Sequence, residues 1–137
     1  MIRPLVQMPL LLQRPSTPAT IEDLAVAQDL QETLEAHKSH CAGLAANMIG
    51  VTKRIIAIVG PEGETLVMLN PEIVTKSGEY STEEGCLSLP GTRPCTRYKR
   101  ITVEYLNDQL KPCKKTFTGT PAQAIQHELD HCNGILI

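Results

Sequence analysis

Two histidines, His127 and His131, stand four residues apart near the end of the chain. In a helix this spacing turns the second side chain about 400° from the first, so both imidazoles leave the same face and can bind one metal ion. Glu128 then projects beside that ion, where a carboxylate can accept a proton from water without being a ligand. The alternative is an ordinary amphipathic helix with two surface histidines. The segment therefore predicts a helix and suggests a metal site on it.

The residues around this segment carry start and stop signals for such a helix. Thr120 is the expected N-cap, Pro121 suits the first helical position, and Gln123 completes a capping box. Asn133-Gly134 supplies the stop, because glycine and asparagine commonly end helices.

Length and composition set the class of protein. A chain of 137 residues with 42% hydrophobic and 20% charged residues fits a single domain, residues 1–137, with a modest core. The net charge is -2 and aromatic residues make up 3%, with no Trp. These values exclude a strongly basic surface for phosphate backbones and a stacking platform for bases, so no specific nucleic-acid partner is expected.

Cysteine usage and the N-terminus indicate a cytoplasmic protein. The five cysteines are an odd number without a CxxC pair, which argues against a disulfide framework and for a reducing compartment. The apolar run Leu10-Leu11-Leu12 lies between Pro9 and Pro15 and is too short for a signal peptide or a membrane span. No membrane association is expected.

The first half of the chain is expected to begin with an arm and a helix. Residues 1–19 hold four prolines and are predicted to form an extended arm on the body of the domain. Thr20 caps a predicted helix that runs to about His40, with apolar residues three and four positions apart on one face.

The middle of the chain predicts strands. Arg54–Val59 and Thr65–Leu69 read as a hairpin around Gly60–Gly63, followed by a short strand at 73–75 and a long loop over 76–97. A loop of that length in a small domain usually carries function. From Tyr98 the apolar residues alternate, which is typical of a half-buried antiparallel strand, and a partner strand with Pro112 at a sheet edge follows over about 110–118. We therefore expect an α+β fold of mainly antiparallel short strands packed around the C-terminal helix.

Two histidines alone do not complete a catalytic metal site, which needs a third protein ligand and an open position. The candidates are the acids nearby and the residues Cys41, Cys86, Cys95, Cys113, Cys132, His37 and His40. Cys132 is turned about 100° from His131 on the helix and is badly placed. Cys86 follows Gly85 in the long loop and has the better context, and a buried structural cysteine is the alternative.

Three segments together resemble the motifs of the peptide deformylase family. Gly43-Leu44-Ala45-Ala46 is similar to its first motif, Glu84-Gly85-Cys86-Leu87-Ser88 to its second, and Gln126-His127-Glu128-Leu129-Asp130-His131 to its third. They occur in the family's order, and the resemblance spans about residue 4 to the C-terminus. Many members continue into a further helix beyond the point where this chain ends, so the resemblance implies a short member.

The resemblance implies a hydrolase that removes the N-formyl group from the initiator methionine of new polypeptides. Cys86, His127 and His131 would bind a divalent metal ion, most often Fe(2+), with Zn(2+), Ni(2+) or Co(2+) able to replace it. Glu128 would be the general base and acid. The Leu87 N–H would hold the developing oxyanion, and the residues Gly43, Leu44, Gly85 and Leu87 would contact the substrate. The expected partners are formyl-methionyl peptides and, transiently, the ribosome.

The chain departs from the family's first motif at two positions. Cys41 stands where the family usually has Gly, and Met48 where it has a Gln that donates a hydrogen bond to the reacting carbonyl oxygen. A thioether cannot donate. Losing one such donor typically costs about 10²–10³ in rate. Met48 is expected to line the site in that Gln's place, and the neighbouring Asn47 is the alternative donor.

Two rival functions follow from these departures, and one further pair of residues is expected to support the site. The chain could be a deformylase-like metal-binding protein with weak or no activity, or a peptidase that acts on another amide. Asp130 is expected to face away from the ion behind the metal ligands, with Arg97 as its partner.

Overall fold

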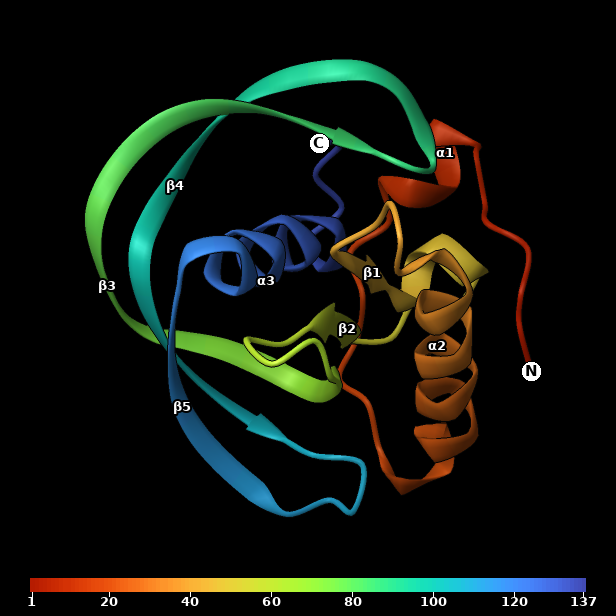
Figure 1. Ribbon diagram of the computed structural model, residues 1–137. Coiled ribbons are helices and arrows are strands. Elements are labelled where there is room, and N and C mark those ends of the chain that lie inside the picture. The colour runs from red at the N-terminus through yellow and green to blue at the C-terminus, as the bar shows by residue number, and fades with distance from the viewer.

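The computed structural model describes residues 1–137 and shows one antiparallel sheet curled around a helix (Figure 1). The five strands lie in the order β1-β2-β3-β4-β5, and every neighbouring pair is antiparallel. The chain order of the elements is α1 (Pro9–Leu12), η1 (Ile21–Asp23), α2 (Leu24–His37), β1 (Gly43–Ala45), η2 (Ala46–Ile49), β2 (Ile55–Val59), β3 (Thr65–Cys86), β4 (Leu89–Leu106), β5 (Pro112–Thr118) and α3 (Gly119–Cys132). The expected α+β class is confirmed.

The N-terminal third follows the sequence prediction with two changes. Thr20 is the N-cap as predicted and forms a capping box with Asp23, and Ala27, Leu30 and Leu34 form the buried stripe of α2. The helix ends at His37 rather than near His40. The arm is also not extended throughout, because Pro9 begins the short helix α1 and Leu12 is fully buried. A proline at the first position of a helix is well tolerated, so the prolines were compatible with a helix here.

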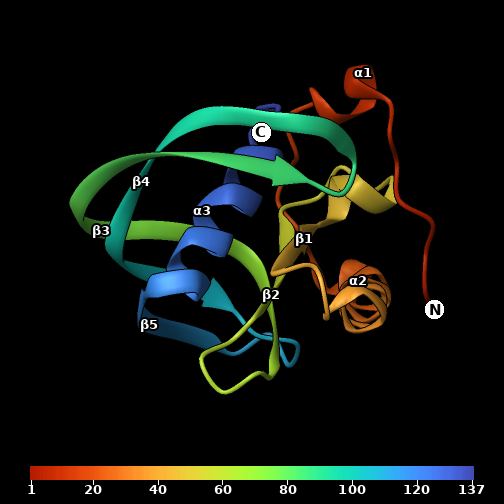
Figure 2. The same cartoon turned by 45° about the horizontal axis from the view of Figure 1, so that its top comes forward.

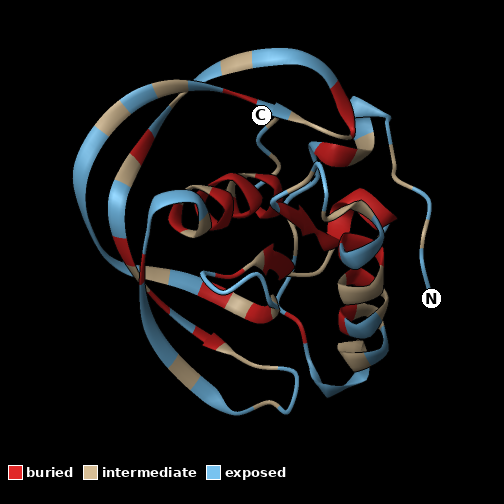
Figure 3. Ribbon diagram, viewed as in Figure 1, coloured by how far each residue is buried: buried red, intermediate tan, exposed pale blue.

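The predicted loop over residues 76–97 is wrong. These residues continue β3 and β4 as a long hairpin that arches over α3 (Figures 1 and 2). The separate short strand at 73–75 is part of β3, and the break at Asn70-Pro71 is a register shift between Leu69 and Glu72. Most side chains of this arm are exposed (Figure 3), so it lacks the hydrophobic alternation that identifies strands in a sequence.

Helix α3 lies in the hollow of the sheet and forms the centre of the core. It contacts β1, β2, β4 and β5, and most of its length is buried (Figure 3). The hairpin of β2 and β3 around Gly60–Gly63 is confirmed, as are the buried face of Ile101, Val103 and Tyr105 and the position of β5 at a sheet edge.

The sequence predicted the C-terminal end of α3 correctly and its N-terminal end incorrectly. Asn133 is the C-cap, and the N–H groups of Gly134 and Ile135 bond to the carbonyls of His131 and Asp130, which is the pattern expected after a glycine stop. At the other end the predicted N-cap is wrong, because the helix begins at Gly119, one residue before Thr120. Gln123 is not part of a capping box either, because its amide is bonded to Glu84.

None of the helices has the length and apolar character that crossing a membrane requires.

Candidate metal and active site

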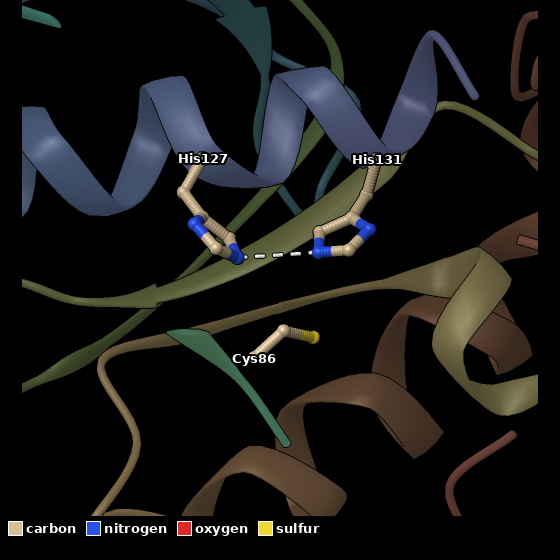
Figure 4. Close-up of side chains that lie close together, drawn as sticks. All are labelled: Cys86, His127 and His131. Carbon is tan, nitrogen blue, oxygen red and sulfur yellow. Dashed lines mark hydrogen bonds between the residues drawn. The ribbon is translucent and has the colours of Figure 1, made fainter. Parts of the chain in front are cut away.

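His127 and His131 project from one face of α3 toward the tip of the β3-β4 hairpin (Figure 4). Their Nε2 atoms are 3.2 Å apart. Two nitrogens that share a tetrahedral metal ion at about 2.0–2.1 Å are separated by about 3.3 Å. The pair is therefore already spaced as two ligands of one ion.

Cys86 faces the two imidazoles from the other side of the site (Figure 4). It is the last residue of β3, where the register of the hairpin shifts between Gly85 and Cys86. Its Sγ accepts a hydrogen bond from the Ser88 N–H at 3.3 Å. The Sγ and one nitrogen of each histidine all lie within 4.8 Å of one another. Thiolate and imidazole are the donors that zinc and ferrous iron accept in proteins, so this set fits a divalent ion.

A buried carboxylate fixes the His127 ring. Glu84 Oε1 lies 2.7 Å from His127 Nδ1, which leaves Nε2 for the metal. Arg97 holds the same carboxylate through Nη2 at 2.7 Å and reaches Asp130 Oδ2 through Nη1 at 2.9 Å. The structure thus places Arg97 against Asp130, and it adds Glu84 as the group that links both to the metal ligand.

Charges around this network shift the protonation of its members. Burial alone would raise the pKa of Glu84, but hydrogen bonds from His127, Arg97 and Gln123 outweigh it and lower the pKa to about 2. Burial likewise acts to lower the pKa of His127, but its hydrogen bonds with Cys86 and Glu84 raise the pKa to about 10. Burial and the nearby His127 charge lower the pKa of His131 to about 3.

Glu128 lies in the same cavity as a buried acid without a hydrogen-bond partner at Oε1. Burial raises its pKa to about 7. The carboxylate lies against the backbone of Gly43, where an added Cβ would come within 3.2 Å of Glu128 Oε2 and 3.1 Å of the Ala57 carbonyl. A side chain at position 43 would therefore push the carboxylate away. An acid with a pKa near neutrality can both take and return a proton.

A cavity of about 640 Å³ opens onto these groups. Its walls include Gly43, Met48, Gly85 and Leu87 of the predicted site, together with Cys86, His127 and Glu128. Helix α3 contributes Thr120, Gln123 and Ala124 to the wall as well. Leu44 is fully buried in the core and does not line the cavity, so its predicted contact with substrate has no support from the structure.

Met48 and Asn47 have different positions relative to the cavity. Met48 lines it, and its sulfur accepts a hydrogen bond from the Ala45 N–H at 3.4 Å. Asn47 is not part of the wall, because its amide donates to the carbonyls of His131 at 2.9 Å and Leu12 at 3.4 Å. Asn47 thus holds the end of α3 instead of facing a substrate.

Sequence reasoning missed the roles of Glu84 and Gln123. Gln123 lies four residues before His127, so the spacing that joins the two histidines also places Gln123 on their face of α3. Glu84 stands in the segment that resembles the second motif, but its bond to Arg97 could not be predicted, because it crosses a hairpin that the sequence does not reveal.

Comparisons with known proteins agree on one family. The family model for polypeptide deformylase matches residues 2–137. The chain is 49% identical over 138 aligned positions to a peptide deformylase of Clostridium beijerinckii, covering 100% of both chains. It is 41% identical to a peptide deformylase of Halothermothrix orenii, covering 90% of this chain and 80% of that protein.

Solved structures show the same likeness. A Met-Ala-Ser-bound class I type b peptide deformylase from Acinetobacter baumannii superimposes with a TM-score of 0.87 at 30% identity, covering 99% of this chain and 97% of that one. A peptide deformylase from Legionella pneumophila gives a TM-score of 0.86 at 38% identity, covering 99% and 83%.

Proposed function

The chain belongs to the polypeptide deformylase family, and we propose on that premise that the cavity beside α3 is where it hydrolyses formyl-methionyl peptides. It is a metal-dependent hydrolase that removes the N-formyl group from the N-terminus of newly made polypeptides. The observation that carries the assignment to this cavity is the buried Glu128 carboxylate, free at Oε1, beside the cluster of Cys86, His127 and His131.

Glu128 is the group that moves protons in this proposal. Cys86, His127 and His131 would hold a divalent ion, which would supply Lewis acidity at the formyl carbonyl and at a neighbouring water. Glu128 accepts the proton as the water oxygen forms its bond to the formyl carbon. It returns the proton to the amine nitrogen as the carbon–nitrogen bond breaks, which gives formate and the free amino terminus. A pKa of about 7 suits both transfers.

The developing oxyanion has few donors in this chain. We assign the Leu87 N–H as one, because Leu87 lines the cavity at the tip of the hairpin next to Cys86. Met48 occupies the wall but offers sulfur, which cannot donate. The Asn47 amide is already committed to two backbone carbonyls. Turnover should therefore be lower than the same fold with one more donor would reach.

The sheet offers a place for the backbone of the substrate. Strand β1 is at the edge of the sheet and pairs only with β2. Gly43 of this strand lines the cavity. An extended peptide can add to such an edge through main-chain hydrogen bonds, which grip substrates of different sequence alike. This arrangement fits an enzyme whose substrates share an N-terminus and differ beyond it.

We propose ferrous iron as the native ion. One thiolate with two neutral imidazoles leaves a single positive charge on a divalent ion, and a redox-active ion with a thiolate ligand makes the site sensitive to oxygen. Metal analysis of protein purified without oxygen tests this, with zinc, nickel or cobalt as the outcomes that overturn it. Because the substrate is a new polypeptide, we further propose a transient encounter with the ribosome in the cytoplasm.

The assay that tests the function uses formyl-Met-Ala-Ser and anaerobically purified protein. Release of formate that depends on added metal supports a deformylase. Cleavage of unformylated peptides without formate release supports a peptidase, and metal binding without any turnover supports a binding protein.

A further inference from the structure

Gln123 lies one helical turn before His127 on the metal-binding face of α3. Residues 123, 127 and 131 follow one another at intervals of four, so their side chains leave the helix in a row. The Gln123 Nε2 donates to Glu84 Oε2 at 2.7 Å. Because the ionised carboxylate can only accept, the contact fixes which end of the Gln123 amide faces Glu84.

The Glu84 carboxylate is held between two side chains of α3. His127 Nδ1 contacts Oε1 at 2.7 Å, and Gln123 Nε2 contacts Oε2 at the same distance. Arg97 contacts Oε1 through Nη2 at 2.7 Å, and its Nε is 3.1 Å from both oxygens. The short contacts of Arg97 and His127 are thus to Oε1, and Gln123 makes the shortest contact to Oε2. Its removal leaves Oε2 with only the longer bond from Arg97 Nε, so this oxygen of a buried carboxylate is held by a weaker set of donors.

Gln123 also lines the cavity, as Glu84 and His127 do. It shares the wall with Thr120 and Ala124, the residues three positions before it and one after it. Arg97 and Asp130 lie outside this wall. Thr120 makes no side-chain hydrogen bond to Glu84. Gln123 is therefore a residue of the cavity wall that also donates to the carboxylate orienting His127.

We propose that Gln123 is a positioning residue that acts through Glu84 to hold the His127 imidazole for the metal ion, while its stem shapes the cavity for the substrate. The first half concerns metal binding alone. The second half rests on the proposed function, because it assumes that the substrate occupies this cavity.

Two near-isosteric variants separate the donor from the shape. Gln123→Met keeps the length of the side chain and removes the donor, and Gln123→Glu keeps the shape but places a second carboxylate against Glu84. Losing a group that orients a metal ligand typically costs about 10–100-fold in metal affinity. We expect about tenfold weaker binding of Zn(2+) or Co(2+) in Gln123→Met and a larger loss in Gln123→Glu, measured by competition with a chelator. The visible absorption of the Co(2+) form should also shift.

Thr120→Val is the matched control. It changes the same wall one turn away without touching Glu84, so it should alter the KM for formyl-methionyl peptides and leave metal affinity unchanged. Fully loaded Gln123→Met should show the opposite split, with kcat several-fold lower and KM nearly unchanged, because methionine preserves the wall but not the hold on His127.

A double-mutant cycle with Glu84→Gln tests whether Gln123 affects metal affinity through Glu84. If Gln123 acts through Glu84, the loss from Gln123→Met should largely disappear in the Glu84→Gln background, since the carboxylate that it holds is gone. Thermal unfolding of each metal-free variant shows which ones fold. If the double variant does not fold, the metal affinities of Gln123→Met and Thr120→Val are compared instead.

Wild-type metal affinity in Gln123→Met, an equal loss in Thr120→Val, or full additivity in the cycle would overturn the proposal. These measurements need no substrate. A protein whose metal affinity depends on Gln123 but that releases no formate would contradict the proposed function and leave the positioning role intact.

Discussion

The side-chain amide of Asn47 donates a hydrogen bond to the backbone carbonyl of His131 at 2.9 Å, joining η2 to the last turn of α3. The first and third sequence motifs are therefore bound together directly behind the metal site. Because the contact occupies the Asn47 amide, that amide is not available as a donor to a substrate in the cavity.

Asn47→Ala should destabilise the protein by about 1–3 kcal/mol, because it removes a buried amide and leaves carbonyls of His131 and Leu12 short of a donor. Chemical denaturation of the metal-free protein measures the change. Asn47→Ala that folds as stably as wild type but loses most turnover would instead make Asn47 a catalytic donor.

Met48→Gln should raise kcat/KM on formyl-methionyl peptides about tenfold or more, with metal content unchanged. The Met48 sulfur now accepts from the Ala45 N–H at 3.4 Å, and a Gln carbonyl can take over that bond while its NH₂ faces the cavity. A recovered oxyanion donor is worth about 2.7–4 kcal/mol in a well-oriented site. Steady-state kinetics beside Met48→Leu, which offers no donor, is the comparison. Equal rates in the two variants would remove position 48 from the reaction.

Gly43→Ala should lower kcat strongly and keep the metal. The new Cβ would meet the Glu128 carboxylate and the Ala57 carbonyl at about 3.1–3.2 Å, and the carboxylate is the more movable of the two. Metal analysis and turnover on the same sample check this. Gly85→Ala is the comparison, because Gly85 also lines the cavity and its φ is not positive. Full activity in Gly43→Ala would show that Glu128 is not confined by this contact.

Glu84 should make the protein acid-labile in a defined window. Its folded pKa of about 2 lies below the ordinary value of 4.5, so below pH 4.5 the unfolded chain takes up a proton that the folded protein does not. The stabilisation is complete above pH 4.5 and is lost as the pH falls toward 2, by roughly 3 kcal/mol. Unfolding free energies of metal-free wild type and Glu84→Gln measure it. The wild type should lose more stability than the variant between pH 4.5 and 2, and parallel curves would refute the assignment.

Much of the fold was readable from the sequence, as was the placement of His127 and His131 on one face of a helix, and what was not readable has physical reasons. Helix α2 follows from apolar spacing and the Thr20 cap, and the first hairpin follows from its turn residues. The helix that carries His127 and His131 follows from its stop signal at Asn133-Gly134, although its predicted N-cap was wrong. The β3-β4 arm did not, because its strands are stabilised by main-chain pairing and polar cross-strand contacts that leave no hydrophobic period. The local sequence assigns Gln123 to a capping box. Its actual bond is to Glu84, 39 positions away, and no local pattern indicates such a contact.

Glu128→Gln addresses the role of the buried carboxylate most directly, because the amide keeps its shape and cannot act as a base. The measurement is formate release from formyl-Met-Ala-Ser under anaerobic conditions, with metal content determined on the same sample. We expect full metal occupancy and loss of nearly all turnover, with less than about a tenth of the wild-type rate remaining. A variant that holds its metal and keeps more than that rate would contradict the assignment of Glu128 as the proton-transferring group.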